Sequence, residues 1–340
     1  MEPQLTWQKI TLKLSTPFRL SYGTSEERNA YWIRLQDDAG WGEGTIPPYY
    51  NILTDDMEAF WWKASEKSAP FPDDPAEIPA WVGAEGPAPA RCALDIALHD
   101  RIAKKKGLPL FKLLGLPFPS PKSSSFTISI DTPAKMAGIA LKVWKFPIIK
   151  VKLGGDEHDM DRLAAIRAAR PDAKIRVDAN AGWTLDNALR YIREMEHLDL
   201  EMIEQPLDKD DIAGMGKIQS ETRIPIVADE SVQTMKNIEE LAAVGVRGVN
   251  IKLMKVGGVS PAIKMIKRSR ELGLGVMLGC MIETSIGTTA MAHLGGYAEW
   301  LDLDASALIT NDPFDGMIFD ETATVNIPER PGIGVRLKHS

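Results

Sequence analysis

Lysine residues occur in two stretches that otherwise have the composition of buried β-strands. Lys150 and Lys152 lie in PIIKVKLGG, residues 147–155, and Lys252 lies in VNIKLMKVGG, residues 249–258. Residues at positions i and i+2 of a strand project from the same face, so we expect Lys150 and Lys152 to be neighbours. Burial and a neighbouring ammonium group lower the pKa of a lysine, which lets it act as a base near neutral pH. The structural alternative is an edge strand, or a buried stem whose ammonium reaches water.

Acidic residues end three predicted strands that lie between the two lysine-bearing ones. They are Asp178 in RVDAN, Glu204 in MIEQP and Asp229 in VADES. A single strand-end aspartate often caps the helix that follows it. Three carboxylates on adjacent strands, with no His or Cys beside them, instead form a hard oxygen site that suits Mg²⁺.

These lysines and acids together predict a proton-transfer reaction. A substrate carboxylate bound to Mg²⁺ has an acidified α-proton, because the metal stabilises the enolate charge that develops on deprotonation. Lys152 on one face of the planar enolate and Lys252 on the other could remove one proton and return another, which inverts the carbon. We expect Lys150 to assist Lys152 and to contact the substrate carboxylate. An ion pair between Lys252 and Asp229 or Glu230 is the structural alternative, and it is compatible with catalysis.

The elements that would position these residues alternate between short apolar strands and amphipathic helices from about Ser125 onward. The residues that close successive strands recur every 23 to 26 positions, which fits one strand, one helix and two short loops per unit. The predicted strands are FTISID, IIKVKLGG, KIRVDANAGW, LEMIEQPL, IPIVADES, GVNIKLMKVGG, GVMLGCMIETS and WLDLDAS. Because the carboxyl ends of parallel barrel strands open onto one face, residues far apart in sequence are expected to converge there.

The N-terminal part has a different pattern. Residues 1–46 alternate like antiparallel strands, with a hairpin signal at DDAG, and residues 55–114 are predicted to be mainly helical. The clearest helix is APARCALDIALHDRIAKK, residues 88–105. The Pro- and Gly-rich stretch at residues 71–90 is predicted to be a connecting loop.

Composition excludes several classes of partner. The 340 residues carry a formal net charge of -7, which argues against nucleic-acid and anionic-membrane partners. Cys92 and Cys280 are far apart and form no CxxC pattern, so neither a disulfide framework nor a zinc ribbon is supported. No apolar run has the length of a signal peptide or a membrane helix, and we expect a cytoplasmic protein.

As a set and in this order, the motifs resemble those of the enolase superfamily, specifically its muconate-lactonizing-enzyme subgroup. The similar segments are KxK at 150–152, DAN at 178–180, EQP at 204–206, ADES at 228–231, NIKLMKxGG at 250–258, ALDIALHD at 93–100 and GLPLFKLLG at 107–115. The resemblance therefore covers nearly the whole chain.

The resemblance implies an α/β fold, a (β/α)7β modified TIM barrel with an N-terminal α+β capping domain. The capping domain would comprise residues 1–120 together with the returning segment 321–340, and the barrel would comprise residues 121–320. It further implies that Asp178, Glu204 and Asp229 hold Mg²⁺. Asn180 and Glu230 would be hydrogen-bond partners of these ligands. We also expect a homo-oligomer.

Within the subgroup, the last barrel strand favours one activity. Asp302 and Asp304 in EWLDLDAS are separated by one residue, so both carboxylates would face the mouth. Such a pair could bind a cationic group on the substrate, such as the ammonium of a dipeptide. This DxD, together with MIET and its Glu283, resembles the dipeptide epimerases of the L-Ala-D/L-Glu epimerase type. The predicted protein is an isomerase that inverts the α-carbon of the second residue of a dipeptide, with Glu283 among its substrate-binding residues.

The cap segments at residues 16–32 and 45–51 are predicted to select the substrate side chain. Arg19 or Arg28 could bind an acidic side chain. Tyr22, with nearby Phe18, Tyr49 and Tyr50, would favour an apolar or aromatic one. Some family members that prefer a C-terminal Glu carry a basic residue a few positions after the PF pair. This chain has Ser21, Tyr22 and Gly23 there, a departure that counts against an Ala-Glu preference.

Other functions remain open at the level of the sequence. An N-acylamino acid racemase would differ by not requiring a free amine on its substrate. A cycloisomerase, an o-succinylbenzoate synthase and a dehydratase of the same subgroup are further enzyme alternatives. A barrel that only binds peptides or serves as a scaffold is the non-enzyme alternative, which failure to bind Mg²⁺ would favour.

Overall fold

The computed structural model describes residues 5–154 and 156–338, so Gly155 of the predicted Gly-Gly turn lies outside the described residues. Eight parallel strands form one sheet in which spatial neighbours follow chain order. The strands are β4 (Phe126–Ile128), β5 (Ile148–Lys152), β6 (Lys174–Asp178), β7 (Leu200–Glu204), β8 (Ile226–Ala228), β9 (Gly248–Ile251), β10 (Gly275–Gly279) and β11 (Trp300–Asp302). All eight strands predicted from the sequence are confirmed.

The sheet closes into a barrel between its first and last strands. Just before β4, Ser124 bridges Leu301 of β11, and Ser125 N donates to Leu301 O at 3.1 Å. Arg176 of β6 crosses the interior, where its Nη1 donates to the same carbonyl at 2.7 Å and its Nε pairs with Glu201 Oε2 at 2.6 Å. The fold is therefore the predicted α/β barrel.

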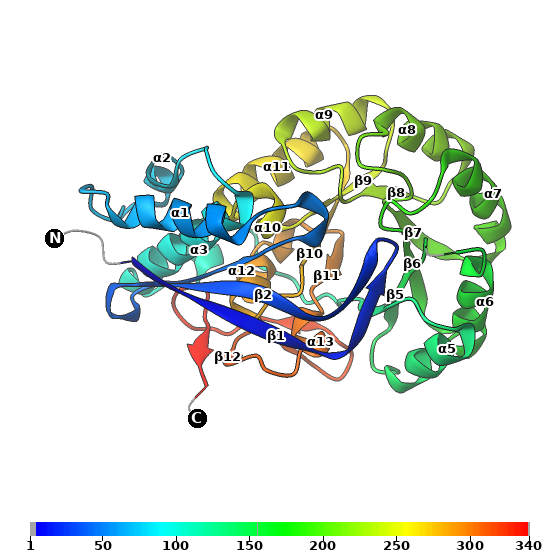
Figure 1. Ribbon diagram of the computed structural model, residues 1–340, viewed down its shortest axis with the longest axis horizontal. Helices are drawn as coiled ribbons and strands as arrows, with labels where there is room; N and C mark the ends of the chain where they lie inside the picture. The colour runs from blue at the N-terminus through cyan, green and yellow to red at the C-terminus, as the bar shows by residue number, and fades with distance from the viewer. Residues whose placement is uncertain (1–4, 155, 339–340) are drawn as a thin grey trace.

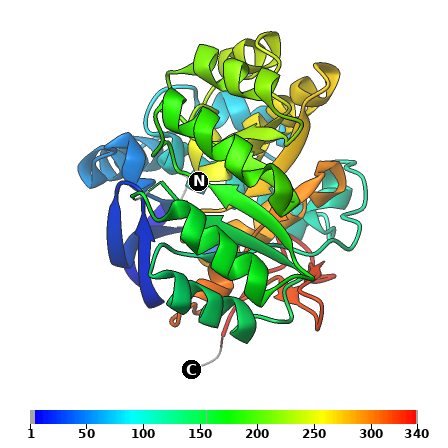
Figure 2. The same cartoon turned by 90° about the vertical axis from the view of Figure 1, so that its right-hand side faces the viewer.

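Helices cover the outside of the barrel (Figure 2). They are α5 (Pro133–Lys142), α6 (Asp159–Ala169), α7 (Leu185–Met195), α8 (Ile212–Glu221), α9 (Met235–Ala243), α10 (Leu253–Val256), α11 (Val259–Glu271), α12 (Ser285–Ala292) and α13 (Ala305–Leu308). In β5, Ile149 and Val151 belong to the main hydrophobic core. The alternate residues Lys150 and Lys152 consequently face the barrel interior.

The N-terminal part is a three-stranded antiparallel sheet packed on helices (Figure 1). Its elements are β1 (Leu5–Leu20), β2 (Gly23–Leu35), β3 (Trp41–Thr45), α1 (Thr54–Ser65), α2 (Ile78–Val82), α3 (Ala88–Lys105) and α4 (Leu110–Leu113). The hairpin predicted at DDAG joins β2 to β3, and α3 has the predicted bounds. Helix α3 is buried on two sides, because Leu94 and Leu98 pack in the core of this part and Cys92 and Ile96 pack in the main core.

The prediction that residues 71–90 form only a loop is wrong. This stretch contains a 3-10 turn, Pro75–Glu77, followed directly by α2. Proline is tolerated in the first turn of a helix, where its missing N–H has no intrahelical partner. Ile78, Trp81 and Val82 of α2 are buried, so packing maintains a helix that the Pro-rich composition obscures.

Buried carboxylates attach the N-terminal part to the barrel. Asp95 Oδ1 on α3 accepts from Val259 N at 2.6 Å, at the start of α11. Glu43 on β3 accepts from Thr284 N and from Thr284 Oγ1, at 2.9 and 2.6 Å, at the start of α12. A negative charge is stabilised at a helix N-terminus by the unpaired N–H groups and the helix dipole. Two barrel helices are thus held from outside the barrel.

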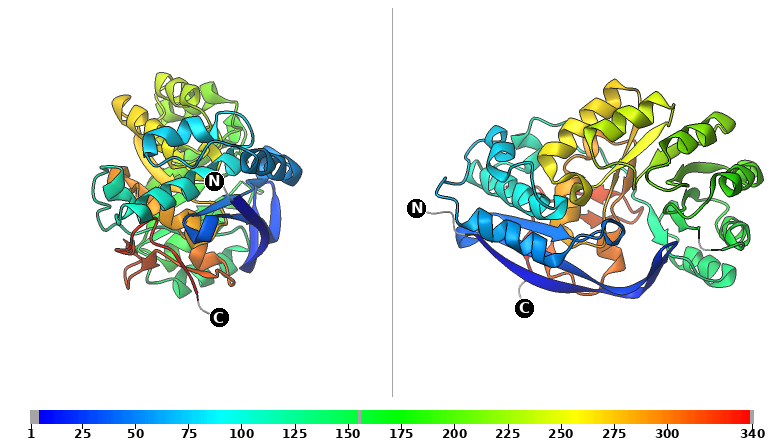
Figure 3. Two further views of the ribbon diagram at one scale, coloured as in Figure 1. Left: turned by 90° about the vertical axis from the view of Figure 1, so that its left-hand side faces the viewer. Right: turned by 45° about the horizontal axis from the view of Figure 1, so that its top comes forward.

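The β1–β2 hairpin is a long ribbon that reaches from the cap helices across the mouth of the barrel (Figures 1 and 3). At its tip, Ser21 Oγ donates to Asn180 O at 2.7 Å, directly after β6. Further back along β1, Arg19 O accepts from Ile130 N at 3.1 Å, directly after β4. The ribbon therefore lies over the carboxyl ends of the strands.

The C-terminal residues run back to the N-terminal helices. They form the short strands β12 (Phe314–Asp315), β13 (Ile318–Phe319), β14 (Val325–Asn326) and β15 (Arg336–Leu337). Ile333 N donates to Asp100 Oδ1 of α3 at 2.8 Å, and Leu110 N of α4 donates to Gly332 O at 2.8 Å. The division of the chain at residues 120 and 320 stays a prediction. Among the residues described, no helix combines the length and apolar character needed to cross a membrane.

Close contact between β3 and α3 predicts a large effect of one added methyl group. A Cβ at Gly42 would lie 1.9 Å from Ala93 O, whereas a Cβ at Gly138 of α5 would meet no atom within 4 Å. We expect Gly42→Ala to lower the free energy of unfolding by about 1–3 kcal/mol, as overpacked cores do. Gly138→Ala should raise it by about 0.5–1 kcal/mol, because alanine favours a helix. Urea unfolding followed by circular dichroism measures both, and equal midpoints would contradict the packing argument.

Candidate active site

The strand-end residues meet in one pocket between the barrel mouth and the underside of the cap. From the barrel, the pocket is lined by Thr127, Lys150, Lys152, Asn180, Asp229, Glu230, Lys252, Lys255, Cys280, Met281, Ile282, Asp302, Asp304 and Leu308. From the cap, it is lined by Phe18, Leu20, Tyr22, Arg28 and residues 45–50. Nine of the thirteen predicted site residues line this pocket, over a sequence separation of more than 280 positions.

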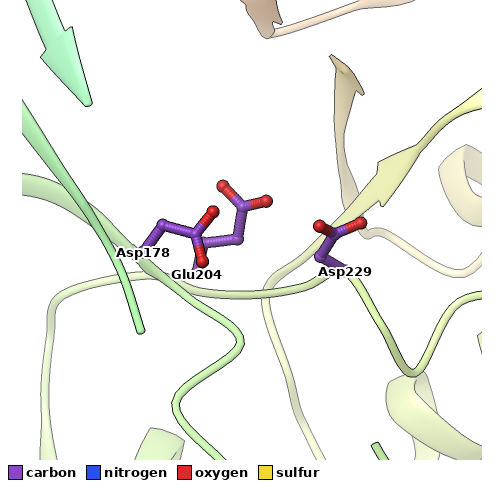
Figure 4. Close-up of side chains that lie close together, drawn as sticks. All are labelled: Asp178, Glu204 and Asp229. Atoms are coloured by element: carbon purple, nitrogen blue, oxygen red, sulfur yellow. The ribbon is translucent and has the colours of Figure 1, made fainter. Parts of the chain in front are cut away.

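Three carboxylates form a compact cluster on one side of this pocket. Asp178, Glu204 and Asp229 each offer one oxygen, and these oxygens lie within 4.8 Å of one another (Figure 4). Strand register explains the arrangement, because Asp178 pairs with Glu204 across β6 and β7 and Asp229 directly follows β8.

The donor set fits a magnesium ion. Three buried carboxylates are the hard oxygen ligands that Mg²⁺ prefers. In the described part of the chain, Glu204 Oε2 accepts no hydrogen bond, although Lys150 Nζ lies 2.7 Å away at ion-pair distance. A carboxylate oxygen that is ion-paired but not hydrogen-bonded keeps lone pairs that a metal ion can use.

Two lysines flank the cluster, as the sequence predicts. Lys152, the last residue of β5, places Nζ 2.6 Å from Asp178 Oδ2. Lys252, directly after β9, places Nζ 2.7 Å from Asp229 Oδ2. Burial acts to lower the pKa of Lys252, but the carboxylates of Asp229, Glu204 and Glu230 together outweigh burial and hold the pKa above its usual value. The acid-bearing strands β6, β7 and β8 lie between the two lysines.

Lys150 has three carboxylate neighbours. Its Nζ lies 2.9 Å from Asp178 Oδ2, 2.7 Å from Glu204 Oε2 and 2.8 Å from Asp302 Oδ2. Burial acts to lower the pKa of Lys150, but these carboxylates raise it well above the usual value. The ammonium therefore stays charged and offsets the repulsion among the acids, a role that the sequence pattern did not indicate.

The carboxylates differ in how firmly they hold a proton. Burial opposes ionisation of Asp178, but Lys150 and Lys152 lower its pKa to about 2. Glu204 is the opposite case, because burial and the nearby Asp178 charge raise its pKa to about 7. Burial and Asp229 likewise raise the pKa of Glu230 to about 8. One cluster thus contains acids that are charged and acids that titrate near neutrality.

Hydrogen bonds from Asn180 orient one carboxylate of the cluster and its neighbour Glu230. Asn180 N donates to Asp178 Oδ1 at 2.9 Å, and Asn180 Nδ2 donates to Glu230 Oε1 at 3.1 Å. Both residues therefore lie beside the cluster, where the sequence predicts them.

Three further residues hold the cluster and were missed by sequence reasoning. Asn250 Nδ2 donates to Glu204 Oε1 at 2.8 Å, Gln205 Oε1 accepts from Asp229 N at 2.8 Å, and Lys255 Nζ donates to Asp229. The sequence could have indicated them, because all three lie inside motifs that carry the family resemblance: Gln205 in EQP, and Asn250 and Lys255 in NIKLMK.

A second pair of acids, Asp302 and Asp304, lines the same pocket, and Lys150 links Asp302 to the cluster. Asp302 accepts from Ser125 Oγ at 2.6 Å and pairs with Lys150, whereas Asp304 accepts from Thr127 N at 2.6 Å. Asp304 forms no salt bridge with any residue that the structure describes. Burial and the neighbouring Asp302 raise the pKa of Asp304 to about 7.

Two predicted substrate-binding residues lie outside the pocket lining. Arg19 is exposed, and its Nε donates to Thr24 Oγ1 at 3.3 Å. Glu283 is buried behind the lining, against Gly287, where burial and Glu43 raise its pKa well above the usual value. Tyr22 does lie in the lining, with its ring 5.5 Å from that of Tyr49.

The fold and the acidic cluster with flanking lysines define a barrel enzyme with a metal centre at its mouth. The family model described as enolase C-terminal domain-like matches residues 134–340. The chain belongs to the enolase superfamily, as the resemblance of its motifs predicted.

Individual relatives match over nearly their full length. The chain is 33% identical to the L-Ala-D/L-amino acid epimerase of Maribacter sp., covering 98% of this chain and 99% of that protein. It is 34% identical to the L-Ala-D/L-Glu epimerase of Bacillus subtilis, covering 96% and 94%. The crystal structure of a dipeptide epimerase from Cytophaga hutchinsonii, complexed with Mg and the dipeptide D-Ala-L-Val, superposes with a TM-score of 0.92 at 28% identity, covering 98% of this chain and 95% of that one.

The raised pKa of Glu204 predicts pH-dependent magnesium binding. A carboxylate with a pKa of about 7 is increasingly protonated as the pH falls below 7, so a metal ion must then displace a proton. We expect the apparent affinity for Mg²⁺ to fall by about tenfold per pH unit below pH 7 and to level off above it. Calorimetric titration between pH 5.5 and 8.5 measures this, and proton release appears as a dependence of the heat on the buffer. An affinity independent of pH would contradict a proton on the cluster.

Proposed function

We propose that the protein is a Mg²⁺-dependent dipeptide epimerase, an isomerase that inverts the α-carbon of the second residue of a dipeptide. The observation that carries this proposal is the meeting, in one pocket, of a carboxylate cluster flanked by two lysines with a separate acidic pair. The epimerase relatives support it, and so does the structural neighbour that contains Mg and a dipeptide.

Lys152 and Lys252 are the proposed acid and base. In the proposed mechanism Asp178, Glu204 and Asp229 would hold Mg²⁺. Its charge would acidify the α-proton beside the substrate carboxylate and would weaken the ion pairs between these acids and the lysines. One lysine Nζ removes the α-proton, and the other protonates the opposite face of the resulting enolate. Because the lysines stand on opposite flanks of the cluster, protonation of the second face inverts the carbon.

The acidic pair is the proposed site for the substrate ammonium. Asp302 is already neutralised by Lys150, whereas Asp304 has no cationic partner among the described residues. An ammonium beside Asp304 would supply the missing charge and favour the ionised carboxylate. An N-acylated amino acid has no such charge, so this geometry favours a dipeptide with a free amine over the substrate of an N-acylamino acid racemase.

The cap is proposed to exclude water from the reaction. Tyr50 OH donates to Glu230 O at 3.1 Å, and the hairpin tip is held at Asn180. Contacts of this kind would close the barrel mouth around a bound dipeptide. Exclusion of water would then strengthen the electrostatic interactions between the substrate and the charged residues of the pocket. The cytoplasmic location and the homo-oligomeric state stay predictions.

The two-lysine mechanism predicts solvent exchange at one carbon. With Mg²⁺ in D₂O, wild-type protein should incorporate deuterium at the α-carbon of the second residue of L,L-dipeptides, measured by mass spectrometry. Lys152→Ala and Lys252→Ala should each lower epimerisation by about 10²- to 10⁴-fold, the usual contribution of a positioned acid or base. Lys142→Ala on the exposed side of α5 serves as the matched control. Epimerisation at the wild-type rate in either folded active-site variant would rule out the mechanism.

The proposed ammonium site predicts a requirement for a free amine. Asp304→Asn keeps the size of the side chain but removes its charge, so kcat/KM for L,L-dipeptides should fall by about 10- to 100-fold, the value of a charge-assisted hydrogen bond. Activity on N-acetylated dipeptides should be low in the wild type and nearly unchanged in the variant. If acetylated and free dipeptides instead incorporated deuterium at the α-carbon at equal rates, the protein would be a racemase of acylated substrates.

A further inference from the structure

Lys252 stands at the start of a short closed turn, residues 252–258, which we call the lysine turn. Its carbonyl oxygen accepts from Lys255 N at 3.0 Å, and Leu253 O accepts from Gly258 N at 3.1 Å. These hydrogen bonds make the lysine turn a compact link between β9 and α11. A displacement at its far end, at Gly258, is therefore transmitted to Lys252.

The far end of the lysine turn is held by a residue of the cap. Gly258 occupies the N-cap position of α11 and has no side chain that could accept a hydrogen bond there. Asp95 of α3 takes this role, because its Oδ1 accepts from Val259 N at 2.6 Å and from Ser260 N at 3.2 Å. A carboxylate at this position also interacts favourably with the helix dipole. Helix α11 is thus capped by a residue 164 positions away in the sequence.

The contact between Asp95 and the lysine turn is tightly packed. Asp95 is 2% exposed, and a Cβ on Gly258 would lie 2.5 Å from Asp95 Oδ1. His99, one turn further along α3, places Nδ1 3.3 Å from the same oxygen. Helix α3 packs against both α10 and α11 (Figure 1). Both partners of the hydrogen bonds are therefore fixed in position.

The turn that follows the other acid–base lysine is held differently. After Lys152, Gly154 N donates at 2.7 Å to Asp159 Oδ2 of α6, which belongs to the barrel. The carboxylate that holds the turn after Lys252 comes instead from the cap. The two lysines thus depend on carboxylates from different parts of the chain.

We propose that Asp95 is a positioning residue for Lys252. This inference rests on the proposed function, in which Lys152 and Lys252 each serve one face of the substrate α-carbon. Proton transfer requires the lysine Nζ at hydrogen-bond distance from the carbon's proton, and a misplacement of about 1 Å can cost about 100-fold in rate. Loss of the Asp95 acceptor therefore impairs the face that Lys252 serves and spares the face that Lys152 serves.

Deuterium exchange measures the two faces separately. A lysine that has removed the α-proton exchanges its ammonium hydrogens with D₂O and can return a deuteron to the same face. The substrates are the L-Ala-L-Xaa dipeptide that the wild type exchanges fastest and its L,D-epimer, with saturating Mg²⁺. Lys252→Ala should abolish exchange in one epimer, which we call the Lys252 epimer, and Lys152→Ala should abolish it in the other.

The cap variant should follow the pattern of Lys252→Ala. Asp95→Ala should lower the initial rate of deuterium incorporation by about 10- to 100-fold for the Lys252 epimer and by less than about threefold for the other. Asp95→Asn keeps an oxygen acceptor, so it should restore both rates to within about threefold of the wild type. Gly258→Ala displaces the same contact from the opposite side and should give the same asymmetry as Asp95→Ala.

Asp100→Ala is the matched control for lost stability. Asp100 is a buried aspartate of the same helix, but it accepts from Trp41 N at 2.9 Å and from Ile333 N at 2.8 Å, away from the lysine turn. Urea unfolding should show a lower midpoint for both alanine variants, whereas Asp100→Ala should change the two exchange rates by the same factor. Equal losses for both epimers in Asp95→Ala, or the Lys252 asymmetry in Asp100→Ala, would overturn the inference.

The outcomes separate this inference from the proposed function. If the two lysine variants show opposite asymmetries and Asp95→Ala does not follow Lys252→Ala, the epimerase function stands and the role of Asp95 is removed. If Asp95→Ala does not fold, Gly258→Ala decides in the same way. No exchange with any dipeptide, from folded and Mg²⁺-loaded wild-type protein, overturns both.

Discussion

Mutual neutralisation of buried charges at the barrel mouth is the constraint on which the rest of the structure depends. Asp178, Glu204 and Asp229 lie close enough for strong repulsion, and Lys150 and its neighbouring lysines offset this repulsion through short ion pairs. At low dielectric each unpaired charge would be costly, so the number and placement of the lysines follow from those of the acids. The same balance leaves Glu204 and Asp304 with pKa values near 7, which makes them responsive to an added cation.

The barrel provides this balance through strand register, and the cap completes the enclosure. Parallel pairing places Lys152 beside Asp178 and Asp178 beside Glu204, so hydrogen bonds of the sheet set the separation of the charges. Carboxylates of the cap accept hydrogen bonds from the N-termini of α11 and α12, and these bonds fix the position of the cap relative to the barrel. A pocket built in this way can combine precise acid and base positions with a separate surface for recognising the substrate.

The two arginines of the hairpin illustrate the limit of a sequence pattern. Arg19 lies between Phe18 and Leu20, which both line the pocket, so alternation places Arg19 on the opposite face. The alternation of residues along β1 was therefore visible in the sequence. It did not identify the pocket-facing side, because the β1–β2 register shifts between Lys13 and Phe18. The burial of Glu283 against Glu43 could not be read from the sequence, since these residues are 240 positions apart.

The sequence by itself determined the eight strands, their regular spacing and the identities of the acids and lysines at their ends. It could do so because strand alternation and barrel connectivity are local patterns, and because every parallel strand delivers its last residue to the same face. Only the tertiary structure decided which charges pair, that Lys150 is enclosed by three carboxylates, and that Arg28 rather than Arg19 enters the pocket. Those outcomes depend on the twist of a long ribbon and on distances between elements far apart in the chain, which no local pattern encodes.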